Sequence, residues 1–107
     1  MVKKGLIATI VARTGQADKV ESFLTSAADL ARKEEKTVDW FAFRIDEHTF
    51  GIFDTFSDEE GRDAHLNGEI AAKLMEFKDT LLSKEPNIQK IDILGARQQR
   101  MPEKPFM

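Results

Sequence analysis

Residues 50–66 restrict the fold more than any other segment, because a strand pattern runs into a helix pattern without a gap. Aromatic residues recur from Phe50 to Phe56, as in a strand that packs on both faces. Residues 57–60, Ser-Asp-Glu-Glu, match the capping box S-x-x-E and predict a helix that begins with Ser57 as its cap. Asn67-Gly68 interrupts this helix. A chain built around this unit must combine a sheet with helices.

The segments on either side complete a regular order of elements. In addition to the strand over residues 49–56, three segments rich in β-branched and aromatic residues predict strands: residues 5–13, 38–46 and 88–97. Apolar residues at helical spacing predict helices over residues 16–35 and 69–83, and we expect the charged run 32–36 to be solvated. The order β-α-β-β-α-β is typical of the ferredoxin-like α+β fold, an antiparallel four-stranded sheet with helices on one face. We predict one domain over residues 1–97 and a C-terminal tail over residues 98–107.

The short link around residues 46–48 predicts an antiparallel hairpin. If Glu47-His48 is its loop, Phe43 lies opposite Ile52 on one face. The other face then carries five residues: Trp40, Ala42, Arg44, Phe53 and Thr55. Both faces are therefore apolar and aromatic, but the helices of one chain can cover only one of them. We expect a second copy of the chain to cover the other, so that the protein is a homodimer through the sheet face.

The overall composition excludes several classes of protein. The chain has 107 residues and a net charge of -3, and its basic residues are scattered among acids, so we expect no nucleic-acid partner. No apolar run approaches the roughly 20 residues of a membrane span, so we expect no membrane partner. The sequence contains no cysteine, which excludes disulfides and thiol catalysis and is compatible with a cytoplasmic location.

Metal and nucleotide chemistry have no recognisable motif in this chain. Its two histidines, His48 and His65, do not form an H-x-x-x-H pair, and His48 falls in the predicted turn. The six glycines form neither G-x-G-x-x-G nor a Walker loop. We therefore expect no metal site.

His65 is the candidate catalytic residue, because an unperturbed imidazole titrates near neutral pH and can accept a substrate proton. The alternative is that it packs at the end of its short helix, where a cation suits the helix dipole. Trp40 either stacks on a planar substrate or packs in the core or an interface. Arg44 and Asp54 are polar residues on apolar strands, which either bind substrate or are satisfied by ion pairs.

The residues after the third predicted strand resemble the antibiotic biosynthesis monooxygenase family. The resemblance is carried by Asp54-Thr55-Phe56, by the acidic turn Ser57–Glu60 and by Ala64-His65-Leu66. Members are dimeric α+β barrels, and some oxidise phenolic or quinol-like compounds with molecular oxygen and without metal or flavin.

The resemblance implies a small cofactor-independent monooxygenase that acts on an aromatic or quinol-type small molecule. His65 would handle the proton, and five residues would contact the substrate: Trp40, Phe53, Phe56, Arg44 and Asp54. The alternative is a non-catalytic small-molecule-binding or structural dimer of the same fold, because one fold serves many functions. The chain has no tyrosine to donate a phenolic hydrogen bond, which keeps this alternative open.

Relatives that degrade haem use an asparagine on the first strand, a tryptophan at the end of the third and an axial histidine on the long second helix. This chain has no asparagine in residues 6–13, Phe56 replaces the tryptophan, and the axial position falls near Met75. We therefore expect neither haem nor any other cofactor.

Overall fold

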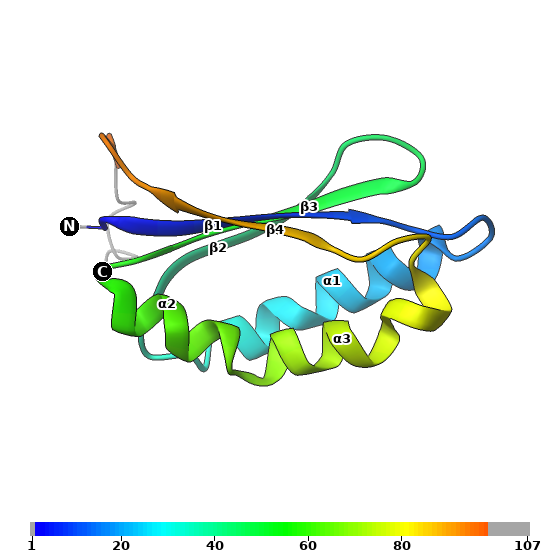
Figure 1. Cartoon of the computed structure of the whole chain (residues 1–107), viewed down its shortest axis with the longest axis horizontal. Helices are drawn as coiled ribbons and strands as arrows, with labels where there is room; N and C mark the ends of the chain where they lie inside the picture. Colours follow the sequence, from blue (N-terminus) through cyan, green and yellow to red (C-terminus); the bar gives the residue numbers. More distant parts are fainter. Residues whose placement is uncertain (1, 99–107) are drawn as a thin grey trace, which may run out of the picture.

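The computed structural model describes residues 2–98. Its elements, in chain order, are β1 (Lys4–Val11), α1 (Ala17–Ala31), β2 (Thr37–Arg44), β3 (Thr49–Phe56), α2 (Glu59–Leu66), α3 (Glu69–Leu81) and β4 (Asn87–Asp92). The strands form one sheet in the order β2-β3-β1-β4, and each neighbouring pair is antiparallel. All three helices cover the same face of the sheet (Figure 1). This confirms the predicted ferredoxin-like α+β fold.

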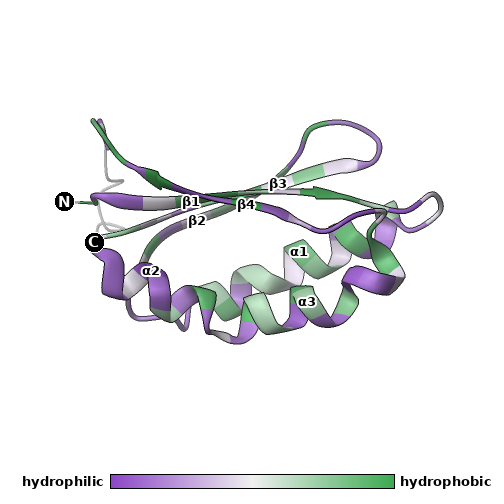
Figure 2. Cartoon of the chain, viewed as in Figure 1, coloured by the Kyte–Doolittle hydropathy of each residue, from purple (hydrophilic) through white to green (hydrophobic). Residues whose placement is uncertain are grey.

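The core lies between the sheet and the helices. Val20, Leu24 and Ala27 form the buried stripe of α1 at the predicted helical spacing, and Ile70 and Leu74 form that of α3. They pack against alternate residues of the central strands: Leu6, Ala8, Ile10, Phe50 and Ile52. The short helix α2 is mostly hydrophilic, whereas α1 and α3 carry apolar residues along their length (Figure 2). Burial of the two long stripes therefore holds the helical layer on the sheet.

The β2–β3 register differs by one residue from the predicted one. Phe43 lies opposite Gly51, not opposite Ile52 as predicted. The loop has three residues rather than two: the Ile45 amide donates to the Thr49 carbonyl at 2.8 Å, which leaves residues 46–48 as the turn. The Asp46 carboxylate stabilises this turn, because its Oδ1 accepts from the backbone N–H groups of His48 and Thr49 at 3.0 and 2.8 Å.

A one-residue slip moves every side chain of a strand to the other face. Trp40 therefore lies beside Asp54 on the helix-covered face. Phe41 and Phe53 lie on the open face, where their rings stack with centroids 6.5 Å apart. Phe43 also lies on the open face, and its ring covers Gly51 so closely that a Cβ atom there would collide with it. The predicted division of residues between the two faces is thus wrong, but both faces are aromatic as predicted.

Three predicted boundaries also change. Asp58, not Ser57, caps α2: its Oδ1 accepts from the Gly61 amide at 2.9 Å. The first helix ends at Ala31 and not near residue 35, and β4 ends at Asp92 rather than at residue 97. The predicted tail over residues 98–107 lies outside the described residues except for Gln98, whose Nε2 donates to the Asp39 carboxylate at 2.9 Å. No helix within residues 2–98 has the length and apolar character needed to cross a bilayer.

Candidate functional site

A groove runs between α1 and the outer strand β2. One section has a volume of about 520 Å³, and Trp40 and Phe50 are its aromatic residues on the helix-covered side, while Phe41 and Phe43 border it at the edge strand β2. An adjoining section of about 310 Å³ shares Trp40 and includes Glu34 and Thr37. The two sections together place a carboxylate at one end of an aromatic wall, on the helix-covered side of the sheet.

Trp40 lines both sections of the groove, together with Ala28 and Arg32 of the helical side. It packs against both parts of the core, and its indole Nε1 is buried with no hydrogen-bond partner within residues 2–98. A buried N–H without an acceptor costs about 1–3 kcal/mol. Because the Nε1 atom is buried, a ligand oxygen reaches it only if the groove opens locally, and on that condition Trp40 is a candidate hydrogen-bond donor to a ligand. The predicted substrate role of Trp40 stays a prediction, and its position is compatible with it.

Beside Trp40, the imidazole of His65 lies between two carboxylates. Its Nε2 is 3.0 Å from Asp54 Oδ2, and its Nδ1 is 2.7 Å from Glu34 Oε1. The side chains of Asp54 and His65 are 1% and 7% exposed, whereas that of Glu34 is 21% exposed. Thr37 Oγ1 donates to the same Glu34 oxygen at 2.7 Å. We refer to Glu34, His65 and Asp54 as the carboxylate–imidazole cluster.

Three different elements build this cluster. Asp54 lies on β3 and faces the helices because its strand partner Trp40 does so. His65 is in the last turn of α2, the helix that Asp58 caps, and the Phe56 ring packs against it at 5.5 Å between centroids. Glu34 belongs to the loop between α1 and β2, and it is the least exposed residue of the charged run 32–36. The cluster therefore joins the sheet, the short helix and the loop at one point.

The geometry favours the charged form of His65. A neutral imidazole has one N–H and one lone pair, so it can satisfy only one of two carboxylate neighbours. An imidazolium donates from both nitrogens and satisfies both, and we therefore assign His65 the charged form. With Glu34 and Asp54 ionised, the cluster then carries a net charge of about -1, and it can accept one further proton.

The pKa values of the two buried members follow from the same contacts. Burial lowers the pKa of His65, but the hydrogen bonds and charges of Asp54 and Glu34 together outweigh burial and raise it above its ordinary value. Burial is the main cause that raises the pKa of Asp54, and the nearby Glu34 charge adds to it, while the hydrogen bond and charge of His65 partly oppose them. The second oxygen of Asp54, Oδ1, is buried and has no partner within residues 2–98. Both groups thus hold protons more tightly than in an unfolded chain.

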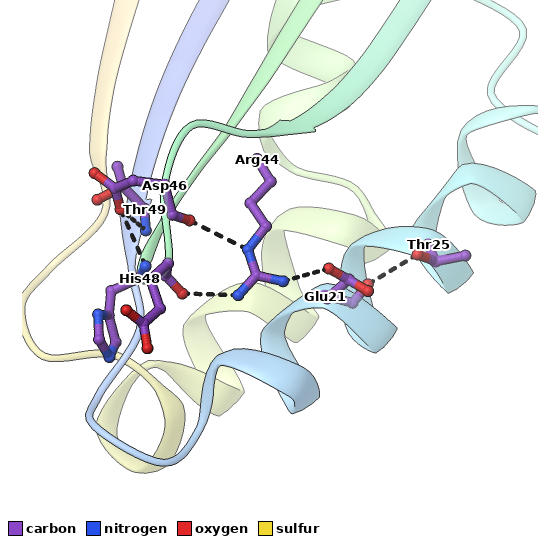
Figure 3. A network of polar contacts seen from close by, with 7 residues as sticks. Glu21, Thr25, Arg44, Asp46, His48 and Thr49 are labelled. Atoms are coloured by element: carbon purple, nitrogen blue, oxygen red, sulfur yellow. Dashed lines mark hydrogen bonds and ion pairs between the residues drawn. The ribbon is translucent and has the colours of Figure 1, made fainter.

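Arg44 lies at the other end of the groove and is held by several acceptors (Figure 3). Its guanidinium donates to Glu21 Oε1 of α1 at 2.7 Å, and to the carbonyls of Asp46 and Glu47 at 3.2 and 2.8 Å. It also lies over the Phe50 ring, 4.9 Å from the centroid. Arg44 therefore ties the hairpin turn to α1 and closes this end of the groove.

The structure gathers some of the predicted site residues and separates others. His65, Asp54 and Phe56 are in contact, and Trp40 is their neighbour across the strand pair. Phe53 points to the open face, on the opposite side of the sheet from this cluster. The predicted roles of all these residues stay predictions.

Glu34 is the member of the site that sequence reasoning missed, because the run 32–36 was expected to be solvated throughout. Its pattern of charges gives no sign of burial, and only the return of the chain toward β2 brings Glu34 to His65. Lys36 in the same run forms an ion pair with Glu60.

No group of three or more potential ligands within residues 2–98 could hold a metal ion. The cluster itself contains three such residues, but the imidazole ring separates Asp54 from Glu34 and binds one carboxylate at each nitrogen. The two carboxylates therefore cannot converge on one ion.

Solved structures resemble this chain, although no protein-family model and no curated protein matches it. A protein from Pseudomonas aeruginosa shares 25% identity over 89% of this chain and 97% of its own, with a TM-score of 0.76. An antibiotic biosynthesis monooxygenase shares 16% identity over 86% of this chain and 99% of its own, with a TM-score of 0.73, and this likeness shows the fold alone. A protein of unknown function from Nitrosomonas europaea shares 46% identity over 94% of this chain and 98% of its own, with a TM-score of 0.91. Because that identity extends over nearly all of both chains, this chain belongs to the same family as the Nitrosomonas europaea protein.

Proposed function

We propose that the protein is a small cofactor-independent monooxygenase that oxidises a phenol or quinol bound in the groove between α1 and β2. The observation that supports this most is the position of Glu34. It lines the groove and at the same time binds His65, so it connects a site for an aromatic molecule with a buried group of proton acceptors.

Glu34 is the member of the cluster that receives the substrate proton in this proposal. Both nitrogens of His65 already have carboxylate partners, and its side chain is 7% exposed, so it does not contact the substrate directly. The Glu34 carboxylate accepts the phenolic proton, and the imidazolium between Glu34 and Asp54 stabilises the remaining charges. Trp40 Nε1 donates to the phenolate oxygen, which supplies its missing acceptor.

The reaction needs no reductant beyond the substrate. The phenolate transfers one electron to oxygen, and superoxide and the phenoxyl radical combine at a ring carbon that carries hydrogen. The proton held by Glu34 returns to the resulting peroxide, and loss of the ring hydrogen together with the terminal OH group as water leaves a quinone. In balance, a phenol and O₂ give a quinone and water, with four electrons passing from the substrate to oxygen.

The proposal includes a homodimer, in which a second copy covers the open face of the sheet. Three apolar residues of β2 and its turn are strongly exposed there: Phe41 at 57%, Phe43 at 42% and Ile45 at 61%. An apolar patch of this kind is typical of an interaction surface. The distant likeness to an antibiotic biosynthesis monooxygenase agrees with the proposed reaction class through the fold only.

Oxygen uptake in the presence of a metal chelator, with a panel of phenols and quinols, tests the reaction. We expect one O₂ consumed per substrate molecule, and a rate about 100-fold lower in Glu34→Gln, because a general base typically contributes a factor of that size or more. Glu35→Gln is the matched control, since Glu35 is exposed and adjacent in sequence. Equal rates in Glu34→Gln and the wild type would refute the role of Glu34.

A second candidate is a non-catalytic dimer that binds a small aromatic molecule. One observation favours it: an imidazole held by two carboxylates also serves as a purely structural joint between α2, β3 and the loop before β2. Calorimetry on the same panel separates the two functions. Binding that depends on Trp40 but consumes no oxygen would establish the second.

A further inference from the structure

A second groove lies on the outer surface of the helical layer, between α1 and α3, and the proposed oxidation does not use it. Its volume is about 700 Å³, within the range of small-molecule sites. Three half-buried apolar residues supply much of its lining: Phe23 and Leu30 from α1, and Phe77 from α3. The rings of Phe23 and Phe77 meet edge to face, with centroids 5.7 Å apart.

The polar lining is positive. Lys19 and Lys73 line this groove, no acidic side chain does, and neither lysine forms an ion pair within residues 2–98. Gln16 also lines it, and its Oε1 is buried without a hydrogen-bond partner among the described residues. Because the two ends of a Gln amide can exchange places, this side chain can donate to an anionic oxygen as well as accept.

The two lysines lie at different levels along the groove. In Figure 1 the helices α1 and α3 run in opposite directions, and the Phe23–Phe77 contact aligns them. Ala27 lies four residues after Phe23 on α1, and Lys73 lies four residues before Phe77 on α3. Because the two helices are antiparallel, Lys73 is therefore level with Ala27. Lys19 is eight residues earlier on α1, which corresponds to about 12 Å along the helix axis. Gln16 is the N-cap residue of α1, so it lies at the same end of the groove as Lys19.

We propose that this groove binds an elongated apolar molecule with a carboxylate at each end. One carboxylate pairs with Lys19 and Gln16, the other pairs with Lys73, and the apolar body lies over the contact between Phe23 and Phe77. An extended chain advances about 1.2 Å per bond, so about ten carbons span the separation of the lysines. The ligand class is therefore that of α,ω-dicarboxylates of about this length.

Titration of the protein with decanedioate, followed by amide NMR shifts, tests the proposal, with decanoate and decanediol as matched probes. We expect decanedioate to shift residues of α1 and α3 around Phe23 and Phe77, and to bind at least about tenfold more tightly than either probe, since each end forms a charge-assisted pair. Lys19→Gln and Lys73→Gln should each remove the preference for decanedioate over decanoate.

Two controls isolate the groove. Lys33→Gln combined with Lys90→Gln removes two charges at exposed positions that do not line it, and should leave binding within about twofold, because exposed distant charges are screened. Ser26→Trp fills the groove from an exposed position and should abolish binding while leaving oxygen uptake unchanged. Three results would each overturn the proposal. They are equal affinity for decanedioate and decanoate, amide shifts confined to the α1–β2 groove, and no binding at concentrations below those at which decanoate forms micelles.

Discussion

The replacement of His65 by alanine gives the most informative test of the carboxylate–imidazole cluster. His65 is the only residue that forms a hydrogen bond or ion pair with the Asp54 carboxylate through its side chain, as far as residues 2–98 are concerned. Asp54 is 1% exposed in the wild type, so only water that enters the space left by the imidazole can replace the lost partner. Removing one partner of a buried ion pair costs about 3–5 kcal/mol.

The cost of protonating Asp54 sets an upper limit on the loss of stability in His65→Ala and makes that loss depend on pH. The variant can avoid a buried unpaired charge by keeping Asp54 protonated. Starting from the ordinary pKa of 3.8, this costs about 4 kcal/mol at pH 7 and about 2 kcal/mol at pH 5, at 1.36 kcal/mol for each pH unit. We therefore expect His65→Ala to lower the free energy of unfolding by about 3–4 kcal/mol at pH 7, and by about half as much at pH 5.

Urea unfolding at both pH values measures this difference, and an unchanged m-value shows that the transition is comparable. His48→Ala is the control, because the His48 side chain makes no hydrogen bond or ion pair within residues 2–98. Adding Asp54→Asn to His65→Ala should recover part of the loss at pH 7, since a neutral amide carries no charge to bury. A loss below about 1 kcal/mol at pH 7, or an equal loss at both pH values, would refute the reasoning.

Four further predictions concern the wild type, the groove and the open face. The free energy of unfolding of the wild type falls as pH rises from about 6.5 through the raised pKa of His65, because the folded protein binds that proton more tightly than the unfolded chain does. The pKa of Asp54 is also raised, so Asp54 adds a decrease in the free energy of unfolding that begins near pH 4. Unfolding curves between pH 6 and 9 that show rising stability would contradict this. Trp40→Phe keeps an aromatic wall but removes the unpartnered N–H, so it should leave stability within about 1 kcal/mol and weaken phenol binding severalfold in calorimetry. Phe41→Asp, on the open face, should convert the expected dimer to a monomer in sedimentation equilibrium, because it places a charge in an apolar interface; an unchanged molar mass at micromolar concentration would count against the sheet-face dimer. Gly51→Ala should displace the Phe43 ring, and we expect it to weaken the same dimer about tenfold while the helix-side core, read by near-UV circular dichroism, stays intact.

The element order was predictable because it depends on local periodicity. The stripes of α1 and α3 and the apolar character of both faces of β3 are properties of neighbouring residues, and the structure has them where the sequence places them. The break at Asn67-Gly68 correctly separates α2 from α3.

The β2–β3 register was not predictable from the same patterns. Aromatic residues occur at both odd and even positions of the two strands, so hydrophobicity does not select a face. The choice depends on the turn, where the Asp46 carboxylate binds two backbone N–H groups and stabilises a three-residue loop. This one side chain decides that Trp40, rather than Phe41, lies beside Asp54.

The candidate site was predictable only in part. His65 and Asp54 attract attention as a titratable group and as a polar residue on an apolar strand, and they are in contact. Glu34 lies 31 residues before His65 in an irregular loop, and no local pattern distinguishes it from Glu35. Its partial burial results from the path of the chain after α1 ends at Ala31, which is a property of the tertiary fold.

The charge of His65 decides whether the cluster can act as proposed, and ¹⁵N NMR of the imidazole ring measures that charge directly. We predict that both ring nitrogens carry protons at pH 7, and that the ring titrates above its ordinary value of 6.5. In Glu34→Gln the titration should move downward, because one of the two carboxylates that stabilise the cation is lost. A ring with one unprotonated nitrogen at pH 6, or a titration at or below 6.5 that Glu34→Gln does not alter, would contradict the assignment of an imidazolium between two carboxylates and the proton acceptor built on it.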